Sequence, residues 1–306
     1  MNLIGKRYLY FAISLLVIVP GLLGLIIWGI PLAIDFTGGS VLDIQFNSGT
    51  TPDPAAVVTL YAQYGFPDTQ VQTSGTNQLI IQSKDMTIDQ KNTIVTAMQK
   101  QFNSGTTELE FSSVGPIIGQ EVTARAGEAV AIAALGILVY ITFAFRGVPH
   151  AFRYGTAAII AMLHDVLVVV GIEALLGHFL GWEADSLFLT ALLTVIGFSV
   201  HDTIVVFDRI RENQNIYRKV SYEKIVNHSM VQTLARSINT QLTVMLVLLA
   251  LALFGGVTIR HFVIILLVGV LSGTYSSIFN ASPILVVWEN KEWRWWFKPS
   301  ARPSEA

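Results

Sequence analysis

Two His-Asp pairs interrupt long apolar runs of this 306-residue sequence. His201 and Asp202 lie in the run GFSVHDTIVVFD, and His164 and Asp165 lie in the run LHDVLVVVG. An ionisable side chain in hydrocarbon is costly and usually faces a bundle interior, a charged partner or a water path. A carboxylate in such a place can bind and release a proton, so proton transfer is the first chemistry that these residues indicate.

Arg236 is a candidate counter-charge for Asp202. It lies near the start of the next apolar run, which opens with TLARSINT, whereas Asp202 lies near the end of its own run. Antiparallel spans joined by one connection bring both residues to a similar depth. An ion pair in low dielectric would keep Asp202 deprotonated, and loss of the pair would favour its protonated form. The two residues therefore predict a proton carrier; the alternative is a static buried salt bridge that fixes helix packing.

The composition is that of a membrane protein and not of a soluble enzyme. Hydrophobic residues make up 52% of the chain and charged residues 13%, and the mean hydropathy is +0.57; in soluble domains about a quarter of residues are charged. A net charge of -2 gives no basic field for nucleic acid, and the absence of cysteine excludes thiol chemistry and argues against zinc. The sequence has no motif of a hydrolytic or redox enzyme. We therefore expect no catalytic residue, cofactor or metal, and only a transmembrane ion gradient as energy source.

Six apolar segments reach the ~20 residues that a bilayer core requires. They are expected at about Tyr8–Ile30, Glu128–Phe145, Tyr154–Leu176, Leu187–Phe207, Thr233–Phe254 and Phe262–Trp288. The predicted fold class is a polytopic α-helical membrane protein with six transmembrane helices.

The positions of Lys and Arg indicate the orientation. If the N-terminus is cytoplasmic, the short cytoplasmic connections and tails receive most of the basic residues, as the positive-inside rule requires. Both termini are then cytoplasmic. The predicted division is an N-terminal tail with helix 1 in residues 1–30, an external domain in 31–122, helices 2–6 in 123–290 with a cytoplasmic loop at about 208–232, and a cytoplasmic tail in 291–306.

The external domain between helices 1 and 2 is expected to be an α+β fold. Strands and helices are predicted in alternation at Val41–Phe46, Asp53–Tyr64, Thr69–Thr73, Gln78–Gln82, Met86–Phe102 and Thr107–Phe111. This strand–helix–strand–strand–helix–strand order is that of a ferredoxin-like domain. Gly38 and Gly39 connect it to the first span and are interpreted as a hinge, with a binding loop as the alternative.

Other ionisable residues have weaker claims. Asp165 is a second candidate proton station, and His201 and His164 are either relay members or simply packed histidines. Glu173 lies near the outer end of its span, where a solvated rim residue is favoured over a proton entrance. His261 is interpreted as an interface residue without a role.

Three motifs together resemble the SecD/SecF family of bacterial protein translocase subunits, and its SecF members in particular. They are DFTGGS at Asp35–Ser40, GFSVHDTIVVFDRIREN at Gly197–Asn213, and Asn227-His228-Ser229 followed by TLARSINT at Thr233–Thr240. The resemblance covers essentially the whole chain. It implies the resistance-nodulation-division type of membrane fold and a place in the bacterial inner membrane. It also implies a proton path in which Asp202 is the acid and Arg236 its basic partner. One departure is His201, where the family commonly has Asn.

The resemblance also implies partners and a function. SecD would complete a pseudo-twofold arrangement of spans, and the pair would work beside the SecYEG channel and SecA on exported, unfolded preproteins. The expected function is to use the proton motive force to promote export. Two alternatives stay open: a small-molecule proton antiporter, which would usually have about twice as many spans in one chain, and a scaffold of the translocase that transports nothing.

Overall fold

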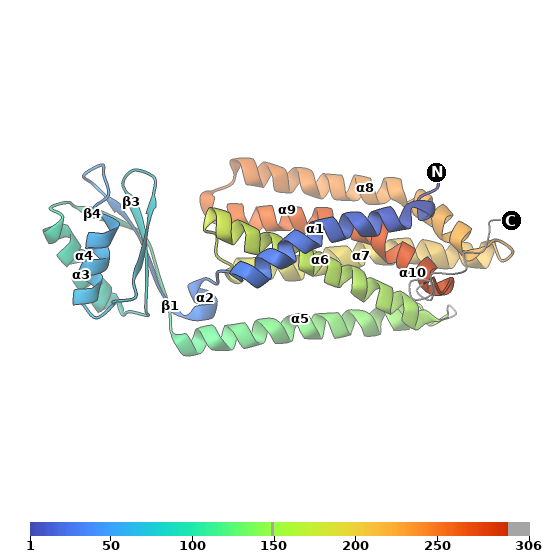
Figure 1. Cartoon of the computed structure of the whole chain (residues 1–306), viewed down its shortest axis with the longest axis horizontal. Coiled ribbons are helices and arrows are strands. Elements are labelled where there is room, and N and C mark those ends of the chain that lie inside the picture. Colours follow the sequence, from blue (N-terminus) through green and yellow to red (C-terminus); the bar gives the residue numbers. More distant parts are fainter. Residues whose placement is uncertain (148–149, 293–306) are drawn as a thin grey trace. The chain divides into compact units, whose positions relative to one another are not determined.

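The computed structural model describes residues 1–147 and 150–292, which form two compact units. One unit consists of Met1–Pro31 and the chain from Ala129 onward, and the other of Leu32–Glu128. Six helical segments are long and apolar enough to cross a membrane (Figure 1). They are α1 (Arg7–Trp28, after the short turn η1, Ile4–Lys6), α5 (Pro116–Ala144), α6 (Ala151–Leu180), α7 (Ser186–Ile216), α8 (Tyr222–Phe254), and the succession α9 (Val257–Ser276), η2 (Ser277–Ala281) and α10 (Ser282–Glu289).

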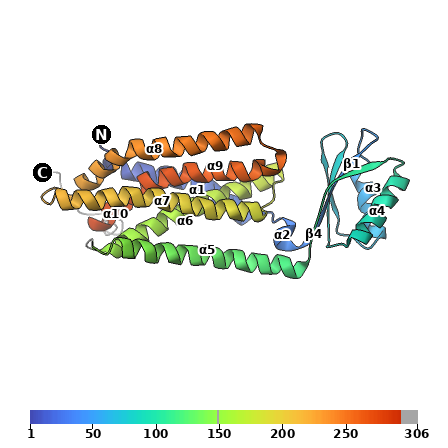
Figure 2. The same ribbon diagram turned by 180° about the vertical axis from the view of Figure 1, so that it is seen from behind.

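The helical bundle is built around α6, α7 and α9, which contact one another (Figure 2). α1 packs against α6, and α8 packs against α7 and α9. Buried apolar side chains gather at both ends, around Phe207 at one end and Val195 at the other. α5 is mostly exposed along its length. The acids of the two His-Asp pairs therefore lie on central helices.

The connection predicted at about residues 208–232 is mostly helical. α7 continues to Ile216 and α8 begins at Tyr222, so only residues 217–221 separate them. Ser221 is the N-cap residue of α8. No Gly or Pro interrupts the chain from there to Phe254, and nothing in the backbone ends the helix between its polar and apolar parts.

The sixth span is not one regular helix. Five residues, Ser277–Ala281, form a π-helical turn between α9 and α10. Pro283 lies in the first turn of α10 and has no N–H to donate to a preceding carbonyl, which favours such an irregular turn before it. The prediction of one continuous span missed this turn, which presents Ser277 and Asn280 to the bundle interior.

The second unit is the predicted α+β domain. Its elements are β1 (Gly39–Phe46), α3 (Pro54–Gln63), β2 (Gln70–Ser74), β3 (Gln78–Ser83), α4 (Ile88–Gln101) and β4 (Thr106–Val114), with the short helix α2 (Ile34–Thr37) before them. The strands form one antiparallel sheet in the order β2-β3-β1-β4. Leu42, Ile44 and Phe46 alternate along β1 and are buried in the core of this unit. The predicted strand–helix order is confirmed.

Capping residues set where the two helices of this domain begin. Asp53 is the N-cap residue of α3, with Pro54 at the start of the helix. Thr87 is the N-cap residue of α4, and it forms a capping box with Gln90.

The conformation of Gly38 and Gly39, and the backbone packed against them in the same unit, leave no room for a side chain at either position. Their φ angles are +74° and +132°, which L-residues with a side chain rarely adopt. A Cβ on Gly38 would lie 2.7 Å from Pro116 Cα, and one on Gly39 would lie 2.8 Å from the Ser83 carbonyl oxygen. Both positions therefore require glycine in this conformation.

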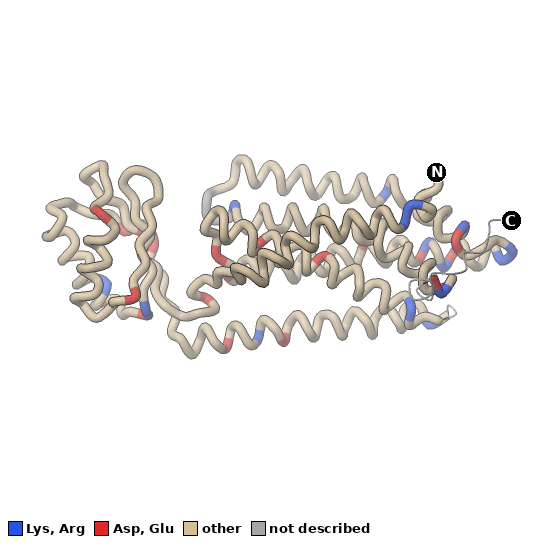
Figure 3. Tube along the Cα trace, in the orientation of Figure 1, with Lys and Arg blue, Asp and Glu red and all other residues tan. Residues whose placement is uncertain are grey.

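Charged residues of the bundle gather at the end where α1 begins and α7 ends (Figure 3). Glu292 is 1% exposed there, and its carboxylate accepts hydrogen bonds from Arg7 at 2.7 and 3.0 Å and from Tyr8 at 2.7 Å. Burial by itself would raise the pKa of Glu292, but hydrogen bonds from Arg7, Asn290 and Tyr8 outweigh it and lower the pKa below its usual range. This end of the bundle is thus tied together by a buried carboxylate.

Replacing Glu292 with glutamine is expected to destabilise the chain near neutral pH by about 1–2 kcal/mol, because the Arg7 guanidinium loses its anionic partner. A lowered pKa in the folded state gives stability that is fully present above about pH 4.5, the unfolded value, and is lost as pH falls through the folded value. Unfolding in mild detergent, followed against pH, measures this. Glu212→Gln breaks an exposed pair with Arg209 and should have little effect. Equal stability of Glu292→Gln and wild type near neutral pH would contradict the prediction.

Candidate functional site

Asp165 is fully buried near the middle of α6 and is surrounded by hydrogen-bond donors. Ser199 of α7 donates to Asp165 Oδ2 at 2.5 Å, Ser276 of α9 donates to the same oxygen at 2.6 Å, and Ser272 donates to Oδ1 at 2.7 Å. Three central helices therefore meet at one carboxylate. Donors of this kind stabilise the charged form of a carboxylate in a place where water cannot.

His164 adds a titratable group to this site. Its Nδ1 lies 3.0 Å from Asp165 Oδ1, and its ring lies beside that of Tyr275, with the ring centroids 6.3 Å apart. His164 Nε2 is buried, and no described residue bonds to it. The imidazole can thus pass a proton between its two nitrogens and the carboxylate.

Asp202 is also buried, at 5% exposure, but it has far fewer partners than Asp165. Ser237 of α8 donates to Asp202 Oδ1 at 2.8 Å. Asp202 Oδ2 is buried, and no described residue bonds to it. Gln241 lies one turn beyond Ser237 on α8, and its buried Oε1 likewise has no partner among the described residues. One face of α8 therefore presents polar groups to a half-satisfied acid.

Arg236 and His201 lie outside this contact. Both are exposed, and within the described chain Arg236 makes no ion pair with Asp202. The residue after Arg236, Ser237, occupies the place of the expected counter-charge because α8 turns that residue toward α7. The expected ion pair is therefore absent from this structure, although Arg236 is close enough to act on Asp202 through its charge.

Hydroxyl groups lead from one acid toward the other. Ser277 in the π-helical turn donates to the Ser199 carbonyl oxygen at 2.9 Å, and its Oγ lies 2.9 Å from Thr203 Oγ1. Ser199 bonds to Asp165, and Thr203 directly follows Asp202 in the chain. The interior between the two carboxylates is thus polar.

Sequence reasoning missed these hydroxyl residues. Ser272, Ser276 and Ser277 stand in the run LSGTYSSIFN, and the first two are one helical turn apart. Small polar residues at a spacing of four within an apolar span indicate a polar face turned to the bundle interior, which was the available signal.

Glu173 and His261 form a further buried pair between α6 and α9. His261 Nε2 lies 2.8 Å from Glu173 Oε2, and the Glu173 side chain is fully buried. The interpretation of Glu173 as a solvated rim residue is therefore wrong: α6 turns this position inward, against α9.

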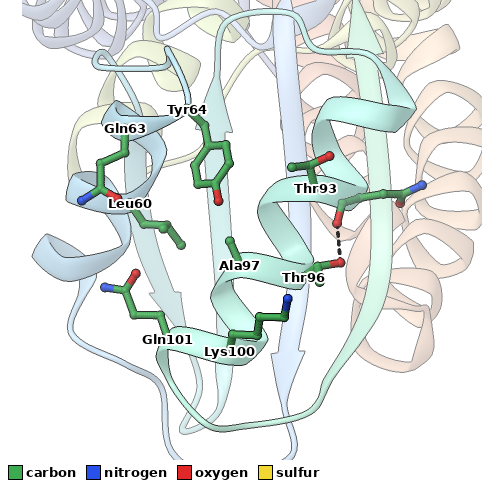
Figure 4. Close-up of a pocket in the computed structure, with 9 residues that line it drawn as sticks. Leu60, Gln63, Tyr64, Thr93, Thr96, Ala97, Lys100 and Gln101 are labelled. Carbon is green, nitrogen blue, oxygen red and sulfur yellow. Dashed lines mark hydrogen bonds between the residues drawn. The ribbon is translucent and has the colours of Figure 1, made fainter.

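The α+β domain offers a groove of a different kind. A hollow of about 750 Å³ lies between α3 and α4 (Figure 4). Its lining is mostly neutral: Leu60, Gln63, Tyr64, Asn92, Thr93, Thr96, Ala97, Lys100 and Gln101. Because Lys100 is the one charged residue in this lining, the groove does not match a proton site. Residues 1–147 and 150–292 bring together no group of three or more His, Cys, Asp or Glu residues fit for a metal ion.

Two family models match separate parts of the chain, and one of them covers more than half of it. The one described as "Protein export membrane protein SecD/SecF, C-terminal" matches residues 94–291, and the one described as "SecD/SecF GG Motif" matches residues 27–49. The second match contains Gly38 and Gly39.

Curated relatives are similar along their full length. The chain is 59% identical to a protein translocase subunit SecF from Anaerolinea thermophila, with 100% of both chains covered. It is 50% identical to one from Thermobaculum terrenum, with 95% of both chains covered.

A solved structure shows the same fold. The crystal structure of SecDF, a translocon-associated membrane protein from Thermus thermophilus, matches with a TM-score of 0.80 and 32% identity, covering 95% of this chain and 39% of that chain. The predicted fold class, six apolar helices with an α+β region after the first, is confirmed. The chain therefore belongs to the SecD/SecF family, as a protein translocase subunit of the SecF type and thus a transport component and not an enzyme.

Proposed function

We propose that this subunit uses the proton motive force, together with SecD, to promote export of preproteins across the cytoplasmic membrane. The observation that carries the proposal is the state of Asp202, a buried acid with one oxygen bonded by Ser237 and the other without a partner among the described residues. Such an acid can take up a proton on Oδ2 without breaking a bond. In this proposal the proton binds at Asp202 Oδ2, the carboxylate oxygen without a partner among the described residues.

Release of the proton requires a counter-charge, and α8 carries one next to Ser237. Consecutive residues are about 100° apart around a helix, so a turn of α8 by one residue would bring Arg236 toward Asp202 in place of Ser237. The carboxylate would then be stabilised in its charged form. Alternation between Ser237 and Arg236 couples proton binding to a movement of α8.

Asp165 is the second proton station in this proposal. Its three serine donors come from α7 and α9, so its protonation state would act on α7, the helix that carries Asp202. His164 is positioned to exchange a proton with it, and His201 has a lesser claim because its side chain is exposed.

The helix movement would be passed to the α+β domain through Gly38, which follows α2, and Gly39, the first residue of β1. We assign the domain to the outer side of the membrane and both termini to the cytoplasm. The support is the gathering of Lys and Arg at the end of the bundle where α1 begins (Figure 3).

SecD is the proposed direct partner. The chain is 33% identical to a protein translocase subunit SecDF of Bacillus subtilis and covers 38% of its length. In that protein the SecF-like part therefore belongs to one longer chain, whose name joins SecD and SecF. The exposed apolar length of α5 is a surface that a partner's spans or lipid would cover. The SecYEG channel, SecA and unfolded preproteins complete the proposed assembly.

Replacing Asp202 with asparagine is expected to abolish the gradient-dependent part of export, because the amide cannot ionise. Membrane vesicles that carry the SecD partner, the channel and either chain would be loaded with a preprotein. Protection of that preprotein from added protease is then measured with the proton gradient intact and collapsed. The expected rate for Asp202→Asn with the gradient equals that of wild type without it.

Asp208→Asn is the matched control, because Asp208 stands on the same helix with an exposed side chain that pairs with Arg211. It should leave gradient stimulation unchanged. Normal assembly with full stimulation in Asp202→Asn would refute the proposal. Export by the double variant Asp202→Asn, Arg236→Ala at the wild-type rate would favour a scaffold that transports nothing.

A further inference from the structure

The pair of Glu173 and His261 lies away from both acids of the proposed path. Glu173 is on α6 and His261 on α9, and the contact between Oε2 and Nε2 is 2.8 Å. Glu173 is eight residues beyond Asp165, which is about 12 Å along the helix axis. Val168 and Val169 between them are buried and apolar. The pair is therefore a site of its own.

One oxygen of this carboxylate is unoccupied. Glu173 Oε1 is buried, and no described residue bonds to it. The surroundings are apolar, with Val169, Val263 and Leu266 in the same core cluster. A buried polar atom without a partner is costly, so its persistence in a membrane bundle calls for a function.

No fixed positive charge neutralises Glu173. Arg260 precedes His261, but its side chain is exposed, and in the described chain it forms no ion pair with Glu173. Asp185 accepts a hydrogen bond from the Phe188 N–H at the start of α7. Within the described chain, the imidazole of His261 is thus the basic group that contacts Glu173.

The remaining titratable groups at this end are Glu183 and His178. Glu183 is half-buried in the loop before α7, and His178 is exposed and stacks on Trp28 with ring centroids 4.0 Å apart. α1 beyond Tyr10, α7 before His201 and α8 beyond Arg236 contribute no titratable residue. Within the described chain, His261 is the titratable side chain in direct contact with Glu173.

The contact between the two side chains can persist in either protonation state. With Glu173 ionised, the His261 Nε2–H donates to the carboxylate; with Glu173 protonated, its O–H donates to Nε2 of the other neutral tautomer. A proton can also be held on the imidazole as His261⁺. The pair therefore accepts and releases a proton without losing its packing.

We propose that Glu173 and His261 form a proton-binding station in the outer half of the bundle, where a proton is held before it reaches Asp165. This inference rests on the proposed function, because the pair would be the place where protons enter the proposed path to Asp165. The 17% exposure of the His261 side chain gives the pair access to the surroundings while Glu173 stays enclosed. Passage onward past Val168 and Val169 requires water or a shift of α6.

The test combines export with a direct readout of the carboxyl group. Vesicles with the SecD partner and the channel would carry wild type, Glu173→Gln, Glu173→Asp or the control Glu183→Gln, an acid at the same end outside the pair. Gradient-dependent export should be lost in Glu173→Gln, retained in part in Glu173→Asp and unchanged in Glu183→Gln. Infrared difference spectra of the full chain, taken across a pH titration, should lose one protonated-carboxyl band in Glu173→Gln and keep it in Glu183→Gln.

Several outcomes would overturn the station. They are full gradient stimulation in Glu173→Gln, an unchanged infrared titration in that variant, or stimulation that follows a sodium gradient in place of the proton gradient. Asp202→Asn assayed in parallel separates the two claims. If Asp202→Asn loses stimulation and Glu173→Gln keeps it, the station fails and the proposed function stands.

Discussion

Replacing Asp165 with leucine is expected to destabilise the helical bundle by about 2–4 kcal/mol and to abolish gradient-dependent export. The carboxylate is fully buried and accepts hydrogen bonds from Ser199, Ser272 and Ser276. Leucine is bulkier than aspartate and accepts none of these hydrogen bonds. Each buried hydroxyl left unpaired costs about 1–3 kcal/mol in soluble proteins, and about 0.6 kcal/mol per hydrogen bond is typical within membranes.

The three serines should not contribute equally. Ser276 can turn to the Gly273 carbonyl oxygen, which already lies 3.2 Å from its hydroxyl. The hydroxyls of Ser199 and Ser272 form no second hydrogen bond with a described residue. Most of the expected loss therefore comes from these two, and unfolding of the purified chain in mild detergent measures it.

A quadruple variant tests the cause of this loss. Removing both sides of a buried hydrogen bond is nearly neutral, so Asp165→Leu combined with Ser199→Ala, Ser272→Ala and Ser276→Ala should recover most of the stability. Export should stay lost in that variant, because the titrating group is gone. A quadruple variant no more stable than Asp165→Leu would contradict the hydrogen-bond explanation.

The fold followed from local patterns because each of its elements is specified by nearby residues. Long apolar runs gave the helices, and Asp53 followed by Pro54 gave the start of α3. The π-helical turn before Pro283 was missed because proline in a helix tolerates several local backbone solutions. Its choice depends on the packing of the neighbouring helices.

Sequence reasoning predicted the two acids of the site but not the hydroxyl groups that bond to them. A carboxylate in an apolar run is visible in one sequence, so Asp202 and Asp165 were named. The rotation of α8, which turns Ser237 and not Arg236 toward Asp202, depends on packing against α7 and α9. A difference of one residue in that rotation changes an ion pair into a hydroxyl contact, and no local signal fixes it.

Replacing Gly171 with leucine is expected to prevent α1 from packing on α6 and to destabilise the bundle by about 3 kcal/mol or more. A Cβ on Gly171 would lie 2.8 Å from the Gly21 Cα, and a Cβ on Gly21 would lie 2.8 Å from the Gly171 Cα. The obstacle on each side is backbone, which cannot rotate away as a long side chain can. Overpacking of this kind typically costs 1–3 kcal/mol even where side chains can adjust. Small residues at such a crossing allow membrane helices to approach closely.

Gly136→Leu is the matched control on another apolar helix, because a Cβ there would meet nothing within 4 Å. In the chain purified alone, Gly136→Leu should unfold like wild type, whereas Gly171→Leu should unfold earlier. Gly171→Ala should show an intermediate loss, since one methyl group already meets the Gly21 backbone.

The double variant Gly21→Ala, Gly171→Ala tests whether close backbone approach stabilises the α1–α6 crossing. It should lose less stability than the sum of its two single variants. The first methyl group already separates the helices, and this separation makes room for the second. Additive losses, or equal stability of Gly171→Leu and Gly136→Leu, would show that the two glycines do not hold this crossing.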